Sequence, residues 1–294
     1  LRGIGDSRTP FLAILFSSAV NVVLDILFVA CLHWGVKGAA AATVISQAAM
    51  TAFLILYAVA KHPLLRFCPG GRLLYGNALE QGFRLGIPPM IQSSVSAFGS
   101  LLLQNFMNGF GTQTVAAITT AYRVDTIILL PIINLGSGIS TIVARNHGAG
   151  EEGRAKRVLA VGTAMMAAVS LFLTILVIPT GGRVIAMFGV GAGAVGIGQD
   201  FFQRIACFYV VFGLATAVRG YLEGIGDVLY SSIAGIVSLI SRILASYGMA
   251  AVFGNMVIAY AEAFSWGVLL ALYLARMGWR RYRMGGPIDS PATP

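Results

Sequence analysis

The sequence predicts an all-α integral membrane protein that contains a parallel internal repeat. Hydrophobic residues make up 57% of the 294 positions and charged residues only 11%, whereas about a quarter of an ordinary soluble domain is charged. The opening LRGIGD at 1–6 returns as LEGIGD at 222–227, which is a spacing of 221 (222 − 1), and each copy precedes a long apolar run. Apolar helices combined with an internal repeat are typical of membrane transport proteins.

Eight stretches provide the roughly 20 apolar helical residues that a bilayer core about 30 Å thick requires. We expect them at about 10–32, 37–60, 84–108, 113–144, 155–179, 200–222, 229–252 and 256–279. Pro10 and the pair Pro88 and Pro89 suit a first helical turn, whereas Pro131 lies inside its helix and should kink it. At the same spacing, Ala13, Ser17, Ala40 and Ala42 meet Ala234, Ser238, Ala261 and Ala263.

The longest polar interruption divides these stretches into two before it and six after it. We expect 1–60 to hold the last two helices of an N-terminal lobe, 61–83 a cytoplasmic linker, 84–280 a six-helix C-terminal lobe and 281–294 a cytoplasmic tail. The second copy of the repeat is preceded by four helices of its own lobe, so the sequence predicts a two-lobe, twelve-helix protein whose first four helices precede Leu1. Copies six helices apart enter the membrane in the same direction, which makes the repeat parallel.

Basic residues indicate the orientation, because Lys and Arg accumulate in cytoplasmic loops. One set of alternate connections carries Arg2, Arg8, Lys61, Arg66, Arg72, Arg84, Arg145, Arg154, Lys156, Arg157, Arg219, Arg276, Arg280, Arg281 and Arg283, and the other only Lys37, Arg183 and Arg204. Residue 1 and the C-terminus are therefore expected in the cytoplasm, in a multi-pass protein of the cell inner membrane. The net charge of +9 lies in membrane-flanking loops and favours contact with anionic lipid over nucleic acid.

Several classes of site are not indicated. Cys31, Cys68 and Cys207 have no CxxC spacing, and His33, His62 and His147 are dispersed, so neither a disulfide framework nor a metal site is expected. The GxGxxG pattern at 191–196 follows no strand, and we interpret it as a flexible external hinge. A Walker sequence is absent. We therefore expect neither an enzyme nor a cofactor, apart from H⁺ or Na⁺ as a coupling ion.

Ionisable groups within apolar segments are functional candidates, since each costs about 2.5–3.5 kcal/mol to insert at the bilayer centre. They are Asp25, Arg123, Asp125, Arg242 and Glu262. Asn21 lies one turn from Asp25 on the same helical face, and an amide oxygen and a carboxylate can jointly hold a proton or a small cation. Burial favours the neutral acid and a nearby cation favours the carboxylate, so a proton and a cationic ligand would compete. The alternative is that Asp25 caps a helix or pairs with an Arg.

A substrate cavity is expected beside the stretch 84–108, which is unusually polar for lipid; interhelical hydrogen bonding is the alternative explanation. Arg123 and Asp125 point to different faces and need partners on other helices. Arg242 occupies the repeat position of Asn21, and an Arg242–Glu262 bridge between adjacent helices is a further hypothesis. The expected cavity residues are Gln92, Ser96, Gln104, Asn105, Arg123, Asp125 and Glu262. Asp6 and Asp227 are expected to cap helix starts.

Five segments in order resemble the multidrug and toxic compound extrusion (MATE) family of bacterial secondary transporters. They are 2–6 with Pro10, 21–25, 35–43, 108–111 with 115–117, and 146–150 before 154–156. The resemblance implies a monomer whose two six-helix lobes alternate between inward-facing and outward-facing states, and which exports cationic amphipathic drugs or metabolites as H⁺ or Na⁺ enters. It also implies that Asn21 and Asp25 belong to the coupling motif of the first lobe. Some relatives carry an acid where this chain has Ser96, so the resemblance gives no support for ion coupling in the second lobe.

Two other functions compete with export. A flippase for lipids or lipid-linked oligosaccharides of related fold would need a cavity rich in basic residues, and Arg123 and Arg242 are too few to favour it. A passive channel or a structural membrane subunit would have no need for Asp25.

Overall fold

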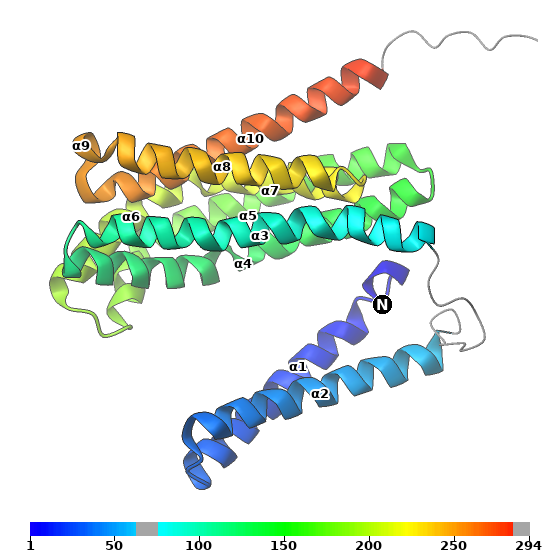
Figure 1. Cartoon of the computed structure of the whole chain (residues 1–294), viewed down its shortest axis with the longest axis horizontal. Helices are drawn as coiled ribbons and strands as arrows, with labels where there is room; N and C mark the ends of the chain where they lie inside the picture. Colours follow the sequence, from blue (N-terminus) through cyan, green and yellow to red (C-terminus); the bar gives the residue numbers. More distant parts are fainter. Residues whose placement is uncertain (63–75, 285–294) are drawn as a thin grey trace, which may run out of the picture. The chain divides into compact units, whose positions relative to one another are not determined.

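The computed structural model describes residues 1–62 and 76–284, and all regular secondary structure in these ranges is helical (Figure 1). Most of the expected linker, residues 63–75, and residues 285–294 of the expected tail lie outside the described residues. The chain forms two compact units, Leu1–Gly76 and Asn77–Pro294. Among the described residues, seven helical segments are long and apolar enough to cross a membrane.

The first unit is a pair of helices. A short turn η1 (Arg2–Ile4) precedes α1 (Arg8–Asp25), which continues as a π-helical segment η2 (Ile26–Cys31), and α2 (Gly35–Lys61) returns beside it. Pro10 lies in the first turn of α1, as expected. The contact between α1 and α2 buries small side chains, namely Ala13, Ser17, Ala42 and Ser46, which lets the two helices approach closely.

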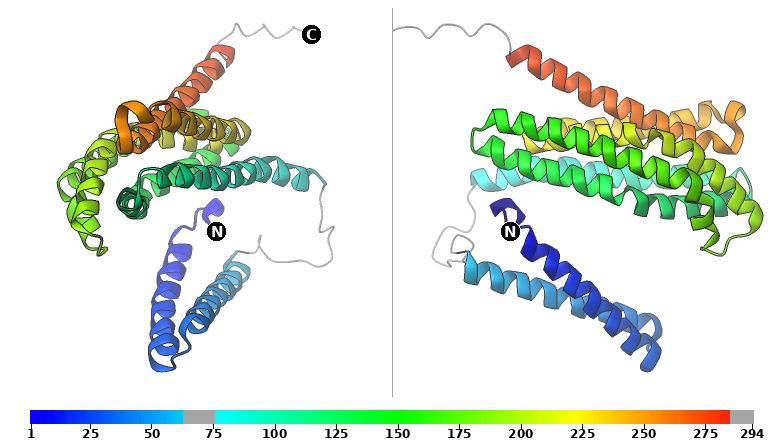
Figure 2. Two further views of the ribbon diagram at one scale, coloured as in Figure 1. Left: turned by 60° about the vertical axis from the view of Figure 1, so that its left-hand side comes forward. Right: turned by 180° about the vertical axis from the view of Figure 1, so that it is seen from behind.

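The second unit is a bundle of helices (Figure 2). Its elements are α3 (Gly76–Asn108), α4 (Thr112–Gly148), α5 (Glu152–Ala186), α6 (Ala192–Ile205), η4 (Ala206–Phe208), α7 (Tyr209–Gly224), α8 (Val228–Gly248), α9 (Ala250–Phe253), η5 (Gly254–Met256) and α10 (Val257–Met284). Helices α4, α5, α6 and α7 pack on one another, and α10 packs against α7 and α8. The main apolar core lies among these helices and includes the fully buried Phe201, Phe202 and Tyr209.

Helix α3 differs from its expectation in two ways. It begins at Gly76, so Pro88 and Pro89 lie inside the helix rather than in its first turn. With 33 residues α3 is long enough to span a bilayer, but it is not one of the seven segments that are also apolar enough. The polar side chains noted in the sequence, such as Gln92 and Ser96, lower its hydropathy.

The prediction of an external hinge at 191–196 is wrong, because Gly191 is the N-cap of α6 and the following residues are helical. Other glycines, further along α6 and on α5, allow close helix contact. A Cβ atom on Gly198 would lie 2.2 Å from Ile185 of α5, and one on Gly181 of α5 would lie 2.8 Å from Phe202. Helices α5 and α6 can therefore approach each other only with hydrogen at these positions.

Gln199 of α6 inserts its side-chain amide into the hydrogen-bond ladder of α5. Its Nε2 donates to the carbonyl of Ile178 at 2.8 Å, and its Oε1 accepts from the N–H of Gly182. Pro179 lies between these two residues within α5. A proline and an inserted side chain both disturb a helical ladder, and here the amide satisfies the backbone groups that water would serve outside a membrane.

The internal repeat is visible in the hydrogen bonds of two helix pairs. Ser17 of α1 donates to the carbonyl of Ser46 of α2 at 3.0 Å, and Ser238 of α8 donates to the carbonyl of Ser265 of α10 at 2.7 Å. Each acceptor residue then donates its own hydroxyl three residues back, Ser46 to Thr43 and Ser265 to Glu262. The α1–α2 pair and the α8–α10 pair thus share the same pattern of interhelical serine hydrogen bonds, as expected of two copies of a repeat.

The spacing of the repeat is not constant along both helices. Ser17 and Ser46 are 29 residues apart, whereas Ser238 and Ser265 are 27 apart, so the offset of 221 in the first helix becomes 219 (265 − 46) in the second. The expected equivalences of Ala40 with Ala261 and of Ala42 with Ala263 are therefore wrong, and Ala42 corresponds to Ala261. Both of these are fully buried. The first copy carries a π-helical segment before its second helix, which accommodates additional residues.

The two repeated aspartates behave differently. Asp6 Oδ1 accepts from the N–H of Thr9 at 3.0 Å, as expected of a cap, and this bond holds the pKa of Asp6 below its ordinary value. Asp227 occupies the N-cap position of α8 but makes no cap bond there. Its carboxylate accepts from Arg276 Nε at 2.7 Å and Arg280 Nη1 at 3.2 Å. Burial alone would raise the pKa of Asp227, but the two guanidinium groups outweigh it and the pKa is lowered. The prediction of a cap is wrong because charge-assisted bonds are stronger.

Gly220 provides a test of the packing between α4 and α7. A Cβ atom there would lie 2.5 Å from the carbonyl oxygen of Gly136, so we expect Gly220→Ala to destabilise the protein by about 1–3 kcal/mol through overpacking. The control is Gly138→Ala, since a Cβ on Gly138 meets nothing within 4 Å. A thermal unfolding series in detergent should show a lower midpoint for the first variant only, and equal midpoints would contradict the packing described.

Candidate functional site

The first candidate site is formed by Asn21 and Asp25 on α1. Asn21 Nδ2 and Asp25 Oδ1 are both buried, and neither atom has a hydrogen-bond partner in the described part of the chain. Leaving such atoms unsatisfied costs about 1–3 kcal/mol each. Asp25 ends α1 directly before the π-helical segment, a geometry that is frequent at functional sites. No arginine pairs with Asp25 within the described ranges, so the ion-pair alternative gains no support there.

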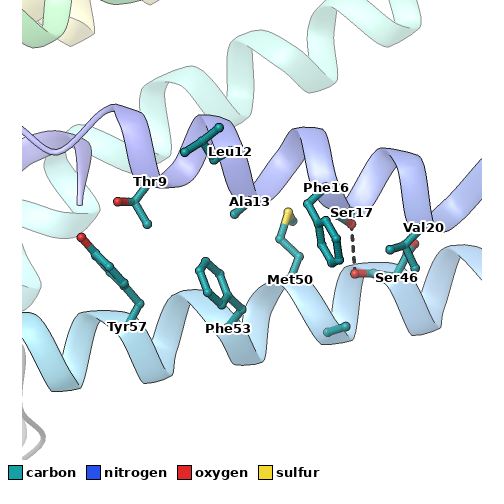
Figure 3. Close-up of a pocket in the computed structure, with 11 residues that line it drawn as sticks. Thr9, Leu12, Ala13, Phe16, Ser17, Val20, Ser46, Met50, Phe53 and Tyr57 are labelled. Carbon is teal, nitrogen blue, oxygen red and sulfur yellow. Dashed lines mark hydrogen bonds between the residues drawn. The ribbon is translucent and has the colours of Figure 1, made fainter.

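A groove lies between α1 and α2 (Figure 3). Its volume is about 510 Å³, and its lining consists of Thr9, Leu12, Ala13, Phe16, Ser17, Val20, Ser46, Ala49, Met50, Phe53 and Tyr57. The side chains of Met50, Phe53 and Tyr57 point from α2 toward α1. The lining carries no charged side chain and ends at Val20, next to Asn21 in the sequence. The first unit thus combines an apolar surface with a polar pair beside it.

The second unit holds a buried polar cluster that joins four helices. Arg242 Nη2 of α8 donates to Glu262 Oε2 of α10 at 3.1 Å and to the hydroxyl of Tyr122 of α4 at 2.7 Å. The hydroxyl of Tyr209 of α7 donates to Asp125 Oδ1 of α4. Asp125 and Glu262 are 3% and 8% exposed. The hypothesis of an Arg242–Glu262 bridge is confirmed.

The charges of this cluster are not balanced. Asp125 interacts electrostatically with both Arg242 and Glu262, so two acids share one base. Arg242 supplies the counter-charge to Glu262 directly, whereas Asp125 receives a neutral donor, the Tyr209 hydroxyl.

The seven residues expected in one substrate cavity occupy separate places in the second unit. Gln92, Ser96 and Gln104 are half-buried on α3, and Asn105 is exposed there. Arg123 is exposed and lines a pocket formed by the first half of α4 and by Asn108, the last residue of α3. Asp125 and Glu262 belong to the buried cluster, so Arg123 and Asp125 have different surroundings, as their spacing predicted. A common role in substrate binding stays a prediction.

Sequence reasoning missed the tyrosines of this cluster. Tyr122 and Tyr209 lie on different helices, and nothing in their spacing points to Arg242 or Asp125. The available signal was a general one, because a buried tyrosine hydroxyl usually finds a hydrogen-bond partner. Two such tyrosines in helices near unpaired intramembrane charges could have been proposed as partners, although without a choice between them.

Comparison with known proteins places this geometry among transporters. Residues 88–248, which are 161 of the 294 positions (248 − 88 + 1), match the family model described as MatE. Over 81% of its length the chain is 30% identical to the probable multidrug resistance protein YpnP of Bacillus subtilis, of which the match covers 53%. Over 96% of its length it is 26% identical to the probable multidrug resistance protein YoeA of the same organism, of which 63% is covered.

Solved structures show the same fold. A crystal structure of a MATE protein in the straight conformation superposes with a TM-score of 0.85 at 19% identity, over 97% of this chain and 64% of that one. The outward-facing conformation of a multidrug resistance MATE family transporter of the MOP superfamily gives a TM-score of 0.81 at 20% identity, over 97% and 64%. The chain thus spans about half to two thirds of the length of the proteins it matches.

Proposed function

Because this chain belongs to the MatE family of multi-pass membrane transporters, we propose that the protein exports cationic amphipathic drugs or metabolites in exchange for H⁺ or Na⁺ by alternating access. Relatives named for multidrug resistance and multidrug export support the substrate class. The family consists of transporters rather than enzymes.

The observation that carries the coupling proposal is the unsatisfied pair Asn21 and Asp25. Asp25 Oδ1 is a buried carboxylate oxygen without a partner among the described residues, and it gains free energy when a proton or a small cation arrives. The buried Asn21 Nδ2 instead needs an acceptor, such as the oxygen of a water molecule. A protonated Asp25 is neutral and has little attraction for a cationic substrate, whereas an ionised Asp25 attracts one. The coupling ion and the substrate therefore cannot occupy Asp25 at the same time. Binding of one requires release of the other, which couples ion entry to substrate export.

The placement in the membrane follows from the charges of the connections. We propose that Leu1, the connection between α2 and α3 and the tail after α10 lie in the cytoplasm. We also propose that α1 and α2 belong to one lobe, and α3 to α10 to the other lobe, of a monomer in the inner membrane. The last turn of α4 carries Arg145, and α5 begins with Arg154 and Lys156 shortly after Glu152. Such a basic connection supports a cytoplasmic position.

Export is tested with inverted membrane vesicles that contain the full chain, with ethidium added to the outside medium and gradients imposed one at a time. Since the ion must leave the lumen as the substrate enters it, we expect uptake when the lumen is more acidic than the medium or holds more Na⁺ than the medium, and none without a gradient. The gradient that drives uptake identifies the coupling ion. Ethidium uptake that is the same with and without each gradient would favour a channel over an antiporter.

A flippase for lipids or lipid-linked oligosaccharides gains little from the described residues. It requires a large basic cavity, and Arg242 is already paired with Glu262 inside the cluster. Arg123 adds one exposed basic side chain, which is too few for such a cavity.

A further inference from the structure

The second unit carries an apolar groove along α10 that the proposed export mechanism does not use. Its volume is about 610 Å³. Phe208 and Val211 line it from η4 and α7, Phe253 lines it from α9, and Phe264 and Val268 line it from α10. None of the lining residues is charged, and Phe264 is 52% exposed. The groove is therefore an open surface that suits a hydrocarbon chain.

A polar pair, Arg204 and Tyr260, lies at the groove near the start of α10. Arg204 Nη1 of α6 donates to the hydroxyl of Tyr260 at 2.9 Å, and Arg204 Cζ lies 5.6 Å from the centroid of the tyrosine ring. Tyr260 itself lines the groove. Arg204 is exposed and forms no ion pair within the described ranges, although Asp200 lies one turn earlier on α6. Since a guanidinium group carries several N–H donors and a tyrosine hydroxyl can also donate, the pair can bind an anionic group.

The groove has about the length of one membrane leaflet. The residues of α10 that line it run from Tyr260 to Ala271, which is a separation of eleven residues (271 − 260) or roughly 16 Å at 1.5 Å per residue. Half of a bilayer core about 30 Å thick is about 15 Å. In the proposed orientation α10 begins at Val257 on the outer side of the membrane. The polar pair then lies toward the outer head groups, where tyrosine is enriched, and the rest of the groove lies in the hydrocarbon.

We propose that this groove binds one phospholipid of the outer leaflet, with an acyl chain along α10 and with the phosphate held by Arg204 and Tyr260. The charges favour this occupant, because phosphate is the group that a guanidinium matches best together with carboxylate, and a lipid is charged at one end only. An apolar helix of a second copy would fill the groove but would leave Arg204 without a counter-charge. Arg204 is also one of only three basic residues expected on the outer side, where such residues are disfavoured.

The test titrates the purified, delipidated full chain in detergent with two lipids and measures the affinity for each by native mass spectrometry. One is phosphatidylglycerol, and the other is diacylglycerol with the same acyl chains but no phosphate. We expect Arg204→Gln to weaken binding of phosphatidylglycerol by about tenfold, the loss of one charge-assisted contact, and to leave diacylglycerol within about twofold. Gly267→Leu should weaken both lipids several-fold, because Gly267 lines the groove and a Cβ atom there meets nothing within 4 Å, so that the new side chain occupies the space of the acyl chain.

Two matched controls should bind both lipids as the unchanged protein does. Arg183→Gln removes another exposed arginine expected on the outer side, at the end of α5. Gly278→Leu adds a side chain to α10 outside the groove, where a Cβ atom also meets nothing within 4 Å.

Three results would overturn the proposal. Unchanged affinity for phosphatidylglycerol in Arg204→Gln would show that the arginine does not hold the phosphate, and equal losses for both lipids in that variant would show that it serves folding instead. A dimer that disappears in Gly267→Leu while lipid affinity stays the same would assign the groove to a second copy of the chain. Ethidium transport is measured separately, so none of these results bears on the exporter function.

Discussion

Replacement of Asp25 by Asn is expected to abolish gradient-driven efflux while leaving the protein in the membrane. The amide has nearly the shape of the carboxyl group but cannot gain or lose a proton, so the site is held in one charge state and the competition between ion and substrate disappears. The measurement is ethidium transport in inverted vesicles, with the amount of protein determined by immunoblot. We expect transport to fall to the level of vesicles that lack the protein.

The same substitution at Asp200 is the matched control. Asp200 is an exposed residue of α6, so Asp200→Asn changes one carboxylate to an amide without touching α1, and transport should be retained. Unchanged ethidium export by Asp25→Asn would remove Asp25 from the mechanism. A loss of transport in both variants would indicate a general effect of surface charge rather than coupling at α1.

The helix pairs of the fold could be predicted because the residues that repeat in the sequence are those that make equivalent contacts between helices. Ala13, Ser17 and their equivalents Ala234 and Ser238 were visible in the sequence at one spacing, and all four are buried in the structure. Small residues at a helix contact leave a direct mark on a sequence, since larger ones cannot replace them. The change of the repeat offset by two residues in the second helix could not be predicted from the sequence, because it depends on how α1 continues into the π-helical segment η2.

The candidate sites were predictable only in part. Intramembrane charges stand out in an apolar sequence, which is why Arg242 and Glu262 could be named and paired. Their tyrosine partners could not, because tyrosine is common in such helices and a contact between distant helices leaves no periodic signal. The prediction for Asp227 was wrong because a local pattern gave way to a distant contact. Its position at a helix start predicted a cap, but its carboxylate accepts a hydrogen bond from Arg276, 49 residues later.

Arg242→Met is expected to destabilise the second unit by about 3–5 kcal/mol, the usual effect of removing one partner of a buried ion pair. The variant leaves Glu262 without its counter-charge and takes the donor from the Tyr122 hydroxyl, and it removes the contact through which α8 bonds α4 and α10 together. The melting temperature of the purified protein in detergent should fall by several degrees.

The double variant Arg242→Met with Glu262→Met separates charge from packing. Removing both partners leaves no unpaired ion, and such replacements are often neutral, so most of the lost stability should return. A double variant as unstable as the single one would show that packing around Arg242, rather than the ion pair, holds α8 to α10.

The position of Arg242 matters because residue 242 is the repeat equivalent of residue 21 (242 − 221). Asn21 in the first copy lies one turn from Asp25, whose Oδ1 has no hydrogen-bond partner among the described residues, whereas Arg242 in the second copy is bonded to Glu262. Equivalent positions of the two copies can therefore differ in role: Asn21 lies beside an acid that can bind an ion, whereas the guanidinium group of Arg242 already neutralises its acid.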